Sequence, residues 1–454
     1  MREEGMTAYE LLLSESQERM LIVAEKGREQ EIIDVYEKWD LNGVVIGEMV
    51  EGDRVTYWKD GEIKADIPAD SLVLGGGAPQ YVREAERPAY LDDVQQFDTD
   101  TLQHSNDFNQ ILLDLLSAPN ISSKRWVHEQ YDTTVRTNTV NAPGNSDSGL
   151  IRIKDSKRGL AAKTDCNGRY VYLNPRRGGQ IAVAESARNV VCSGAKPVAI
   201  TNCLNFGNPY KPDVYWTFAR AIEGMSDACR ALGTPVTGGN VSFYNEHPEG
   251  AVYPTPTIGM LGLVQDVDRH ATTAGFRSAG DVIFLLTPAG WAHRNDLGGS
   301  EYLAHVHEQV TGDAPHLDLD EEVAVQAAMR SLIQAGHVAS AHDISEGGLA
   351  VCLAESALFA EGLGATIELR TDDGVRLDAC LFGEAQSRIV VSVPADRAEA
   401  VQAVLDEHPV RATRIGRVTD SAFRIAVNGQ SVIDVDPAAL REPYETAIPS
   451  RMAG

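Results

Sequence analysis

The chain has 454 residues, of which 43% are hydrophobic and 23% charged, and its formal net charge is −26. This length allows two or three domains with separate cores. The negative charge argues against nucleic acid and anionic membrane as partners, because both would repel it. The six cysteines are far apart without a C-x-x-C pair, and no apolar stretch approaches membrane-spanning length, so we expect a cytoplasmic protein.

The first segment, residues 1–74, is similar to a later part of the chain. Residues 11–23 (LLLSESQERMLIV) predict a strand that turns and resumes, followed by a helix over residues 28–39 and strands over residues 44–50 and 54–58. Residues 381–440 repeat this order. Identical residues recur at a constant offset of 369 positions: Glu15 with Glu384, Gln17 with Gln386, Arg19 with Arg388, Gly47 with Gly416 and Pro68 with Pro437.

This internal repeat has a consequence for the first segment. The second copy ends a unit that begins near residue 105, so the same period predicts roughly 270 residues ahead of the first copy. Residues 1–74 would then be a remnant that cannot bury its core alone. We expect the chain to be the carboxyl-terminal part of a longer, duplicated protein. The alternative is a split gene whose other half is supplied in trans.

Two further domains follow a linker. Residues 75–104 are rich in Gly, Pro and acidic residues, which is typical of a surface linker. A short helix is expected over residues 108–117. Residues 105–268 then alternate strands with helices, so we predict an α/β domain, and residues 269–440 form a second domain that ends in the repeated segment. Residues 441–454 are expected to be a tail.

The most informative stretch is residues 199–246. It reads as a strand, a helix and a second strand, with a polar loop after each strand. Loops at the carboxyl ends of neighbouring strands converge on one sheet edge, where ligands bind. The helix has an apolar stripe at steps of four and three residues: Val214, Phe218, Ile222, Met225, Cys229 and Leu232.

The chemistry of these two loops favours a metal–triphosphate ligand. Gly238 and Gly239 let the backbone approach a bulky anion, Asn240 offers an amide oxygen to a hard cation, and Ser242 offers a hydroxyl. A lone Gly-Gly-Asn would favour a tight turn over a ligand site. The partner loop shifts the balance, because it gathers further polar and small residues: Asn202, Asn205, Gly207 and Asn208.

A second glycine-rich helix start lies in the later domain, within AHDISEGGLAV. Ser345 can cap the helix, while Gly347 and Gly348 leave backbone N–H groups bare, which suits a phosphate. A simple capped helix is an equal alternative on these residues alone.

Several motifs together carry a resemblance to a known family. AITNCLNFGNP, TPVTGGNVSFYNE, PTPTIGMLGLV, AHDISEGGLAV and LFGEAQSRIVVSV resemble, in order and spacing, the second half of phosphoribosylformylglycinamidine synthase, the large synthetase subunit of de novo purine biosynthesis. LSESQERML is similar to the end of its first half. The resemblance implies an α/β (α+β) fold with aminoimidazole-ribonucleotide-synthetase-like amino- and carboxyl-terminal domains. It covers essentially the whole chain.

The resemblance also implies a reaction and its partners. In the family, two halves pack as a pseudo-dimer through their amino-terminal domains, and the active site lies across that interface. ATP, with Mg²⁺, phosphorylates the amide oxygen of formylglycinamide ribonucleotide, and ammonia displaces phosphate to give the amidine. The ammonia comes from a glutaminase subunit (PurQ-type), which acts with a small bridging subunit (PurS-type).

Site residues are carried over by motif. The resemblance implies that Asn202 and Gly239 contact ATP, Asn240 binds Mg²⁺ and Ser242 contacts the substrate. The family often has Asp where this chain has Asn202, which keeps an acceptor oxygen but removes a negative charge. A direct metal role for Asn202 is therefore not expected.

The remnant of the first half would complete the substrate site. By the same resemblance, Glu15, Ser16 and Gln17 hold the substrate. The segment with the family's catalytic histidine is not found in this sequence, so no catalytic residue is assigned and the chain alone is expected to be inactive. Asp343 is a candidate magnesium ligand of an auxiliary nucleotide site. The alternative to a ligase component is a nucleotide-binding scaffold that docks glutaminase partners without catalysis.

Overall fold

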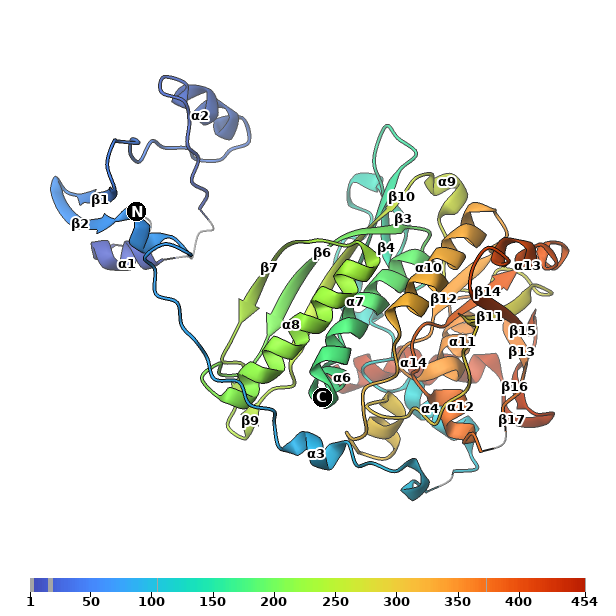
Figure 1. Cartoon of the computed structure of the whole chain (residues 1–454). Coiled ribbons are helices and arrows are strands. Elements are labelled where there is room, and N and C mark those ends of the chain that lie inside the picture. Colours follow the sequence, from blue (N-terminus) through green and yellow to red (C-terminus); the bar gives the residue numbers. More distant parts are fainter. Residues whose placement is uncertain (1–3, 15–18, 104, 373, 454) are drawn as a thin grey trace. The chain divides into compact units, whose positions relative to one another are not determined.

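The computed structural model describes residues 4–14, 19–103, 105–372 and 374–453. Contacts divide the chain into two compact units, Met1–Val82 and Arg83–Gly454. Figure 1 shows the elements of each unit along the chain.

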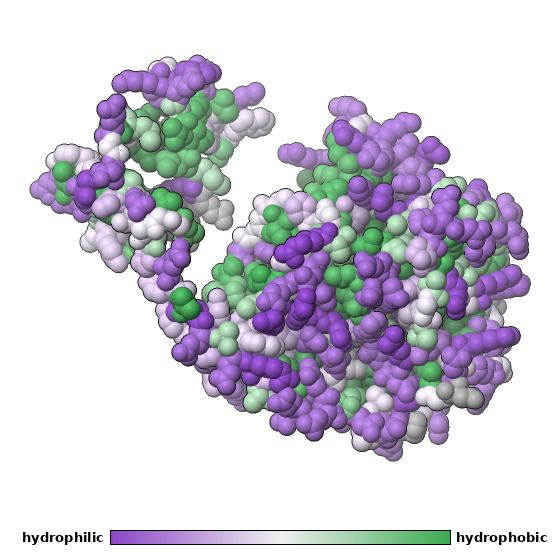
Figure 2. Space-filling view, in the orientation of Figure 1, coloured by the Kyte–Doolittle hydropathy of each residue, from purple (hydrophilic) through white to green (hydrophobic). Residues whose placement is uncertain are grey.

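The first unit has little core of its own. None of its described residues is buried, and large apolar side chains such as Met20 and Met49 are more than four-fifths exposed. Hydrophobic atoms are visible on its surface in Figure 2. Its main elements are α1 (Ala8–Leu13), α2 (Glu29–Lys38), β1 (Arg54–Lys59) and β2 (Glu62–Pro68).

Three expectations for this unit are wrong. Residues 11–13, expected to begin a strand, belong to helix α1, because Thr7 and Glu10 make a reciprocal capping box at its start. The expected continuation of that strand is also wrong, since residues 19–23 form no strand. Residues 44–50 form no strand. The expected helix over residues 28–39 is confirmed by α2, and the last expected strand by β1, which pairs with β2.

The second unit begins with a six-stranded sheet in the order β3-β4-β5-β10-β6-β7. β6 and β7 are parallel, whereas β10 is antiparallel to both β5 and β6. The strands are β3 (Thr139–Asn141), β4 (Gly149–Arg152), β5 (Gly159–Asp165), β6 (Lys196–Asn205), β7 (Val236–Ser242) and β10 (Thr255–Val264).

Helices α7 (Pro175–Cys192) and α8 (Pro212–Leu232) lie side by side across one face of this sheet (Figure 1). Small residues bring them together. A Cβ on Gly224 would meet the carbonyl oxygen of Arg176 at 1.8 Å, and one on Gly179 would meet that of Ala221 at 2.5 Å. α8 ends at Gly233, which adopts a left-handed conformation with φ 67°.

The second sheet has seven strands in the order β12-β14-β11-β15-β13-β16-β17. All its neighbours are antiparallel except β13 and β16. The strands are β11 (Val282–Pro288), β12 (Ser340–Asp343), β13 (Gly364–Leu369), β14 (Ile389–Val393), β15 (Val410–Thr419), β16 (Phe423–Val427) and β17 (Gln430–Val435).

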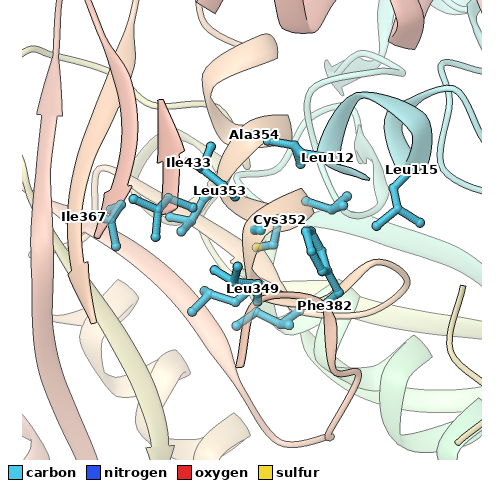
Figure 3. Packing of buried hydrophobic residues seen from close by; sticks show 14 of the residues in the cluster. Leu112, Leu115, Leu349, Cys352, Leu353, Ala354, Ile367, Phe382 and Ile433 are labelled. Carbon is cyan, nitrogen blue, oxygen red and sulfur yellow. The ribbon is translucent and has the colours of Figure 1, made fainter. Parts of the chain in front are cut away.

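Hydrophobic clusters cover both faces of part of this sheet. On one face Ile367 and Ile433 pack with Leu112, Leu353 and Phe382 from the helices (Figure 3). On the other face, a second cluster joins β11 and β14 to three helices, α7, α10 and α13. The α-helices of this region are α4 (Phe108–Leu116), α10 (Leu319–Gln334), α11 (Gly348–Leu358), α12 (Leu377–Phe382), α13 (Ala400–Leu405) and α14 (Pro437–Met452).

The segments expected as linker and tail are partly ordered. Within residues 75–104, Leu91 and Leu102 are buried, and Tyr90 stacks on Tyr172 with ring centroids 4.4 Å apart. Most of residues 441–454 belongs to α14, whose Ala447 is buried. The remaining short elements are α3 (Tyr90–Val94), α5 (Arg125–His128), α6 (Gly168–Leu173), α9 (Val267–His270), β8 (Glu246–His247) and β9 (Gly250–Ala251).

Candidate functional site

The polar residues predicted from residues 199–246 meet on two adjacent strands. β6 and β7 run parallel in a register that places Asn202 beside Gly239, Cys203 beside Asn240 and Asn205 beside Ser242. The expectation that these residues lie in loops beyond the strands is wrong for Asn202, Asn205, Asn240 and Ser242, which form the last part of each strand, whereas Gly207 and Asn208 follow β6 in a loop as expected. The expectation that the two segments converge is confirmed.

Gly239 has a steric reason to be glycine. Its φ is 150°, and a Cβ there would lie 2.2 Å from both the backbone oxygen and the Oδ1 of Asn202. The neighbouring Gly238 has no such constraint, since a Cβ there would meet nothing within 4 Å. The side-chain amide of Asn202 therefore packs directly against the Gly239 backbone.

Asn240 and Ser242 form a second polar pair. Side chains alternate across a strand, so both share the sheet face of Cys203 and Asn205. The Asn240 Nδ2 donates to the Ser242 Oγ at 3.2 Å, which leaves the Asn240 Oδ1 as the group that can accept from a ligand or bind a cation.

The two pairs lie on opposite faces of the sheet. Asn202 alternates with Ile200 and Leu204, which are buried in the cluster beneath α7 and α8. On the other face, Leu261 and Ile151 are exposed to 38% and 46%. That open face therefore presents the Asn240–Ser242 pair, and the helix-covered face presents Asn202.

Glu246, which was not among the predicted site residues, stabilises the loop after β6. Its Oε1 accepts from the Asn208 backbone N–H at 3.1 Å and from Lys211 Nζ at 2.9 Å. These bonds keep the pKa of Glu246 below its usual value. The only indication in the sequence was the position of Glu246 at the end of the second polar segment. Its partners Asn208 and Lys211 lie 38 and 35 positions earlier, so no local pattern connects them.

The helix start at Gly347 and Gly348 is already occupied by a side chain. The Oε1 of Glu384 accepts from the Gly347 N–H at 2.7 Å and from the Glu301 N–H at 2.8 Å. Burial raises the pKa of Glu384 to about 8. The expected cap by Ser345 is wrong, because the helix begins after Gly347 and receives no side-chain cap from Ser345. The protein instead supplies the Glu384 carboxyl group where a phosphate would bind.

Asp343 is also engaged within the protein. Its carboxylate contacts the Arg188 Nε and accepts from Asn189 Nδ2 at 3.3 Å. Arg188 is completely buried and donates further to Glu322 and Gln386, both at 2.8 Å. The candidate ligand Asp343 is thus paired with a guanidinium group and is not open to a metal ion, so the auxiliary magnesium role does not fit this structure.

The predicted residues supply only part of the ligands that a magnesium ion requires. Among the described residues, no group of three or more His, Cys, Asp or Glu side chains is placed to hold a metal ion. Mg²⁺ in phosphate-transfer sites is bound by one or two carboxylates together with the phosphates. Asn240 could add one neutral oxygen, so the residues present fit a supporting contact and not a complete site. Glu15, Ser16 and Gln17 lie outside the described residues.

Two models of one protein family match this chain. The model of the AIR synthase related protein N-terminal domain matches residues 145–264. The model of the corresponding C-terminal domain matches two stretches, residues 1–59 and 278–428, whose ends are 369 positions apart, as the repeat predicts. Among the described residues, no helix is both long and apolar enough to cross a membrane.

Curated relatives are similar over nearly all of the chain. It is 58% identical to the phosphoribosylformylglycinamidine synthase subunit PurL of Salinibacter ruber and 50% identical to that of Chlorobaculum tepidum, over 99% of this chain in both. The chain spans only 59% of the length of each relative.

Solved structures share the fold at low sequence identity. T. maritima PurL complexed with FGAR aligns with a TM-score of 0.60, and the ATP complex with 0.57; each is 18% identical and covers 78% of this chain and 56% or 55% of the other. The PurLQS structure from Thermotoga maritima aligns with a TM-score of 0.56 at 18% identity, covering 79% of this chain and 54% of the other. The predicted α/β fold with two AIR-synthase-like domains is confirmed.

Proposed function

We propose, from the premise that this chain belongs to the family of AIR synthase related proteins, that it forms one wall of a formylglycinamide ribonucleotide ligase. The observation that carries the proposal is the pairing of β6 with β7, which sets Asn202 beside Gly239 and places Asn240 and Ser242 next to them on the open face of the sheet. Similarity to PurL subunits supports this assignment, although it extends over 59% of their length.

In the proposed reaction, ATP phosphorylates the amide oxygen of formylglycinamide ribonucleotide. Ammonia then attacks the activated carbon and phosphate leaves, which gives the amidine, ADP and phosphate. Asn202 and Gly239 would contact ATP, Gly239 through its backbone, which has no side chain to keep a phosphate away. Mg²⁺, when bound, would neutralise charge on the transferring phosphoryl group. Asn240 would hold it through Oδ1, and Ser242 would orient the substrate.

The rest of the active site would come from another polypeptide segment. The face of the first sheet that carries Asn240 and Ser242 also carries Leu261 and Ile151, which are exposed. We propose that this face packs against the equivalent sheet of a first half, which also supplies the catalytic histidine. Glu15, Ser16 and Gln17 would then reach the substrate from the remnant of that half.

The ammonia source defines the remaining partners. We propose a PurQ-type glutaminase and a PurS-type bridging subunit, which is consistent with the PurLQS assembly solved for Thermotoga maritima. The proposed compartment is the cytoplasm. The alternative function is a nucleotide-binding scaffold that docks these partners without taking part in catalysis.

Complementation separates these two functions. The 454-residue chain is mixed with a separately expressed first half, and phosphate release that needs both ammonia and formylglycinamide ribonucleotide is measured. For a ligase component, activity appears only in the mixture, and Asn240→Ala or Ser242→Ala abolishes it. Ser421→Ala, at an exposed position between β15 and β16, is the matched control and should remain active. Nucleotide binding without restored turnover would favour the scaffold.

A further inference from the structure

A cleft opens inside the second sheet, far in sequence from the β6–β7 pair. β13 pairs with β15 only from Gly364 to Ile367, opposite residues 416–419. Beyond Ile367, β13 continues along β16, while residues 410–417 of β15 follow β11. The two strands therefore separate, and a cavity of about 840 Å³ lies where they part. This volume is in the range of sites for small organic ligands, which is ~300–1,000 Å³.

Arginine dominates the charged lining of this cleft. Four arginines line it, against two acidic residues, Glu368 and Asp372. Glu368 is already engaged, since its Oε1 accepts from the Gly429 N–H at 2.8 Å. The arginines are Arg370, Arg411, Arg414 and Arg417.

These arginines lack the partners found elsewhere in the protein. Many arginines of this chain pair with a carboxylate, as Arg424 on β16 does with Asp434 at 2.9 Å. Within the described residues, no ion pair involves any of the four cleft arginines; among their side chains, only that of Arg411 has a hydrogen bond, to the Ala289 carbonyl at 2.9 Å. In a chain of net charge −26, four guanidinium groups that have no carboxylate partner among the described residues form a positive site at this cavity.

One wall of the cleft is aromatic. Trp291 and His293 both line it, with ring centroids 4.6 Å apart and in an edge-on arrangement. Burial lowers the pKa of His293, so this ring is neutral at pH 7 and adds no positive charge. Trp291 gives the cleft a built-in fluorescent reporter.

We propose that this cleft binds a small polyanion that carries two or more phosphate groups. The planar guanidinium group makes paired, charge-assisted hydrogen bonds to phosphate oxygens, and several such groups around one cavity match a ligand with adjacent phosphates. The cleft is formed by β13, β15 and the loop after β11, so it is separate from the proposed ligase residues on β6 and β7.

Inorganic pyrophosphate is a suitable probe for the full 454-residue chain, with binding measured by calorimetry and by tryptophan fluorescence. The double variant Arg411→Gln/Arg414→Gln should weaken binding by at least about tenfold, the loss expected for removing charge-assisted phosphate contacts. Arg424→Gln is the matched control, because it removes an arginine of the same sheet outside the cleft. Asn240→Ala should not change the binding, which separates this cleft from the β6–β7 site.

Trp291→Phe should remove the fluorescence change while calorimetric binding persists. The proposal is overturned if pyrophosphate does not bind, if the double variant binds as the unaltered chain does, or if Arg424→Gln or Asn240→Ala weakens binding equally. If the double variant does not fold, the single variant Arg417→Gln, at an exposed position, is tested instead. Weaker pyrophosphate binding in calorimetry then supports the proposal, and unchanged binding overturns it.

Discussion

The Oδ1 of Asn202 lies 2.2 Å from the place that a Cβ on Gly239 would occupy. The two residues are 37 positions apart in the chain and are brought together by the parallel register of β6 and β7. Any side chain at position 239 must therefore displace the Asn202 amide or spread the two strands. This relationship makes the proposed nucleotide site testable with very small changes.

Gly239→Ala should lower nucleotide binding by the 454-residue chain by more than tenfold, roughly 1.4 kcal/mol or more in binding free energy. The added methyl group collides with Asn202 and moves its amide. Gly238→Ala adds the same methyl group where nothing lies within 4 Å, so it should bind nucleotide almost normally. Equal binding by both variants would contradict the proposed role of this pair, and calorimetric titration with ATP and Mg²⁺ is the measurement.

Arg188→Met should strongly destabilise the unit Arg83–Gly454. Its guanidinium group is completely buried and joins α7 to Asp343, Glu322 and Gln386, so its removal leaves buried carboxylates without a partner. Losing one partner of a buried ion pair costs about 3–5 kcal/mol in the free energy of unfolding.

Arg230→Met is the control for this change. Arg230 is 76% exposed and pairs with Asp227 at 3.3 Å, so its loss should cost no more than about 1 kcal/mol. Urea unfolding followed by circular dichroism compares the two midpoints. Similar midpoints for both variants would show that the buried cluster adds little stability.

His342 should make stability depend on pH in alkaline solution. Burial lowers its pKa, but Asp147 at 2.6 Å and Glu355 at 3.2 Å more than offset this and raise the pKa to about 10. Because the folded pKa is higher than the unfolded one, the stabilisation is complete below about pH 6.5 and is lost as the pH rises through 10.

The expected slope between these values is at most ~1.4 kcal/mol per pH unit. His342→Gln should be less stable at pH 6 and should lose less stability than the unaltered chain between pH 7 and pH 10. Chemical unfolding across this range tests the difference. Parallel curves for the two proteins would mean that His342 does not carry this pH dependence.

Residues 1–82 should exchange their backbone amide hydrogens rapidly in the isolated chain. The described residues of this unit include no buried side chain, and local structure without a core opens easily. Adding a separately expressed first half should slow the exchange in β1 and β2. Strong protection there without a partner, measured by hydrogen exchange and mass spectrometry, would contradict the interpretation of residues 1–74 as a remnant.

Local sequence patterns predicted the long elements of the second unit well. The apolar stripe of residues 214–232 and the stop at Gly233 correspond to α8, and the two flanking strands correspond to β6 and β7. The pattern failed for residues 11–13, where a capping interaction between Thr7 and Glu10 at the start of α1 outweighed the strand-like run of leucines. A capping box involves only two side chains, so the hydrophobic pattern of the neighbouring leucines does not reveal it.

By itself, the sequence determined the repeat at 369 positions, the α/β class and the set of polar residues around Asn202 and Asn240, because periodicity and motif spacing are local properties of the chain. Only the tertiary structure decided how those residues are divided between two sheet faces, that Arg188 neutralises Asp343, and that Glu384 fills the helix start at Gly347. Each of these results depends on contacts between residues 37 to 155 positions apart, whose geometry is set by strand register and packing and is not encoded in any short segment.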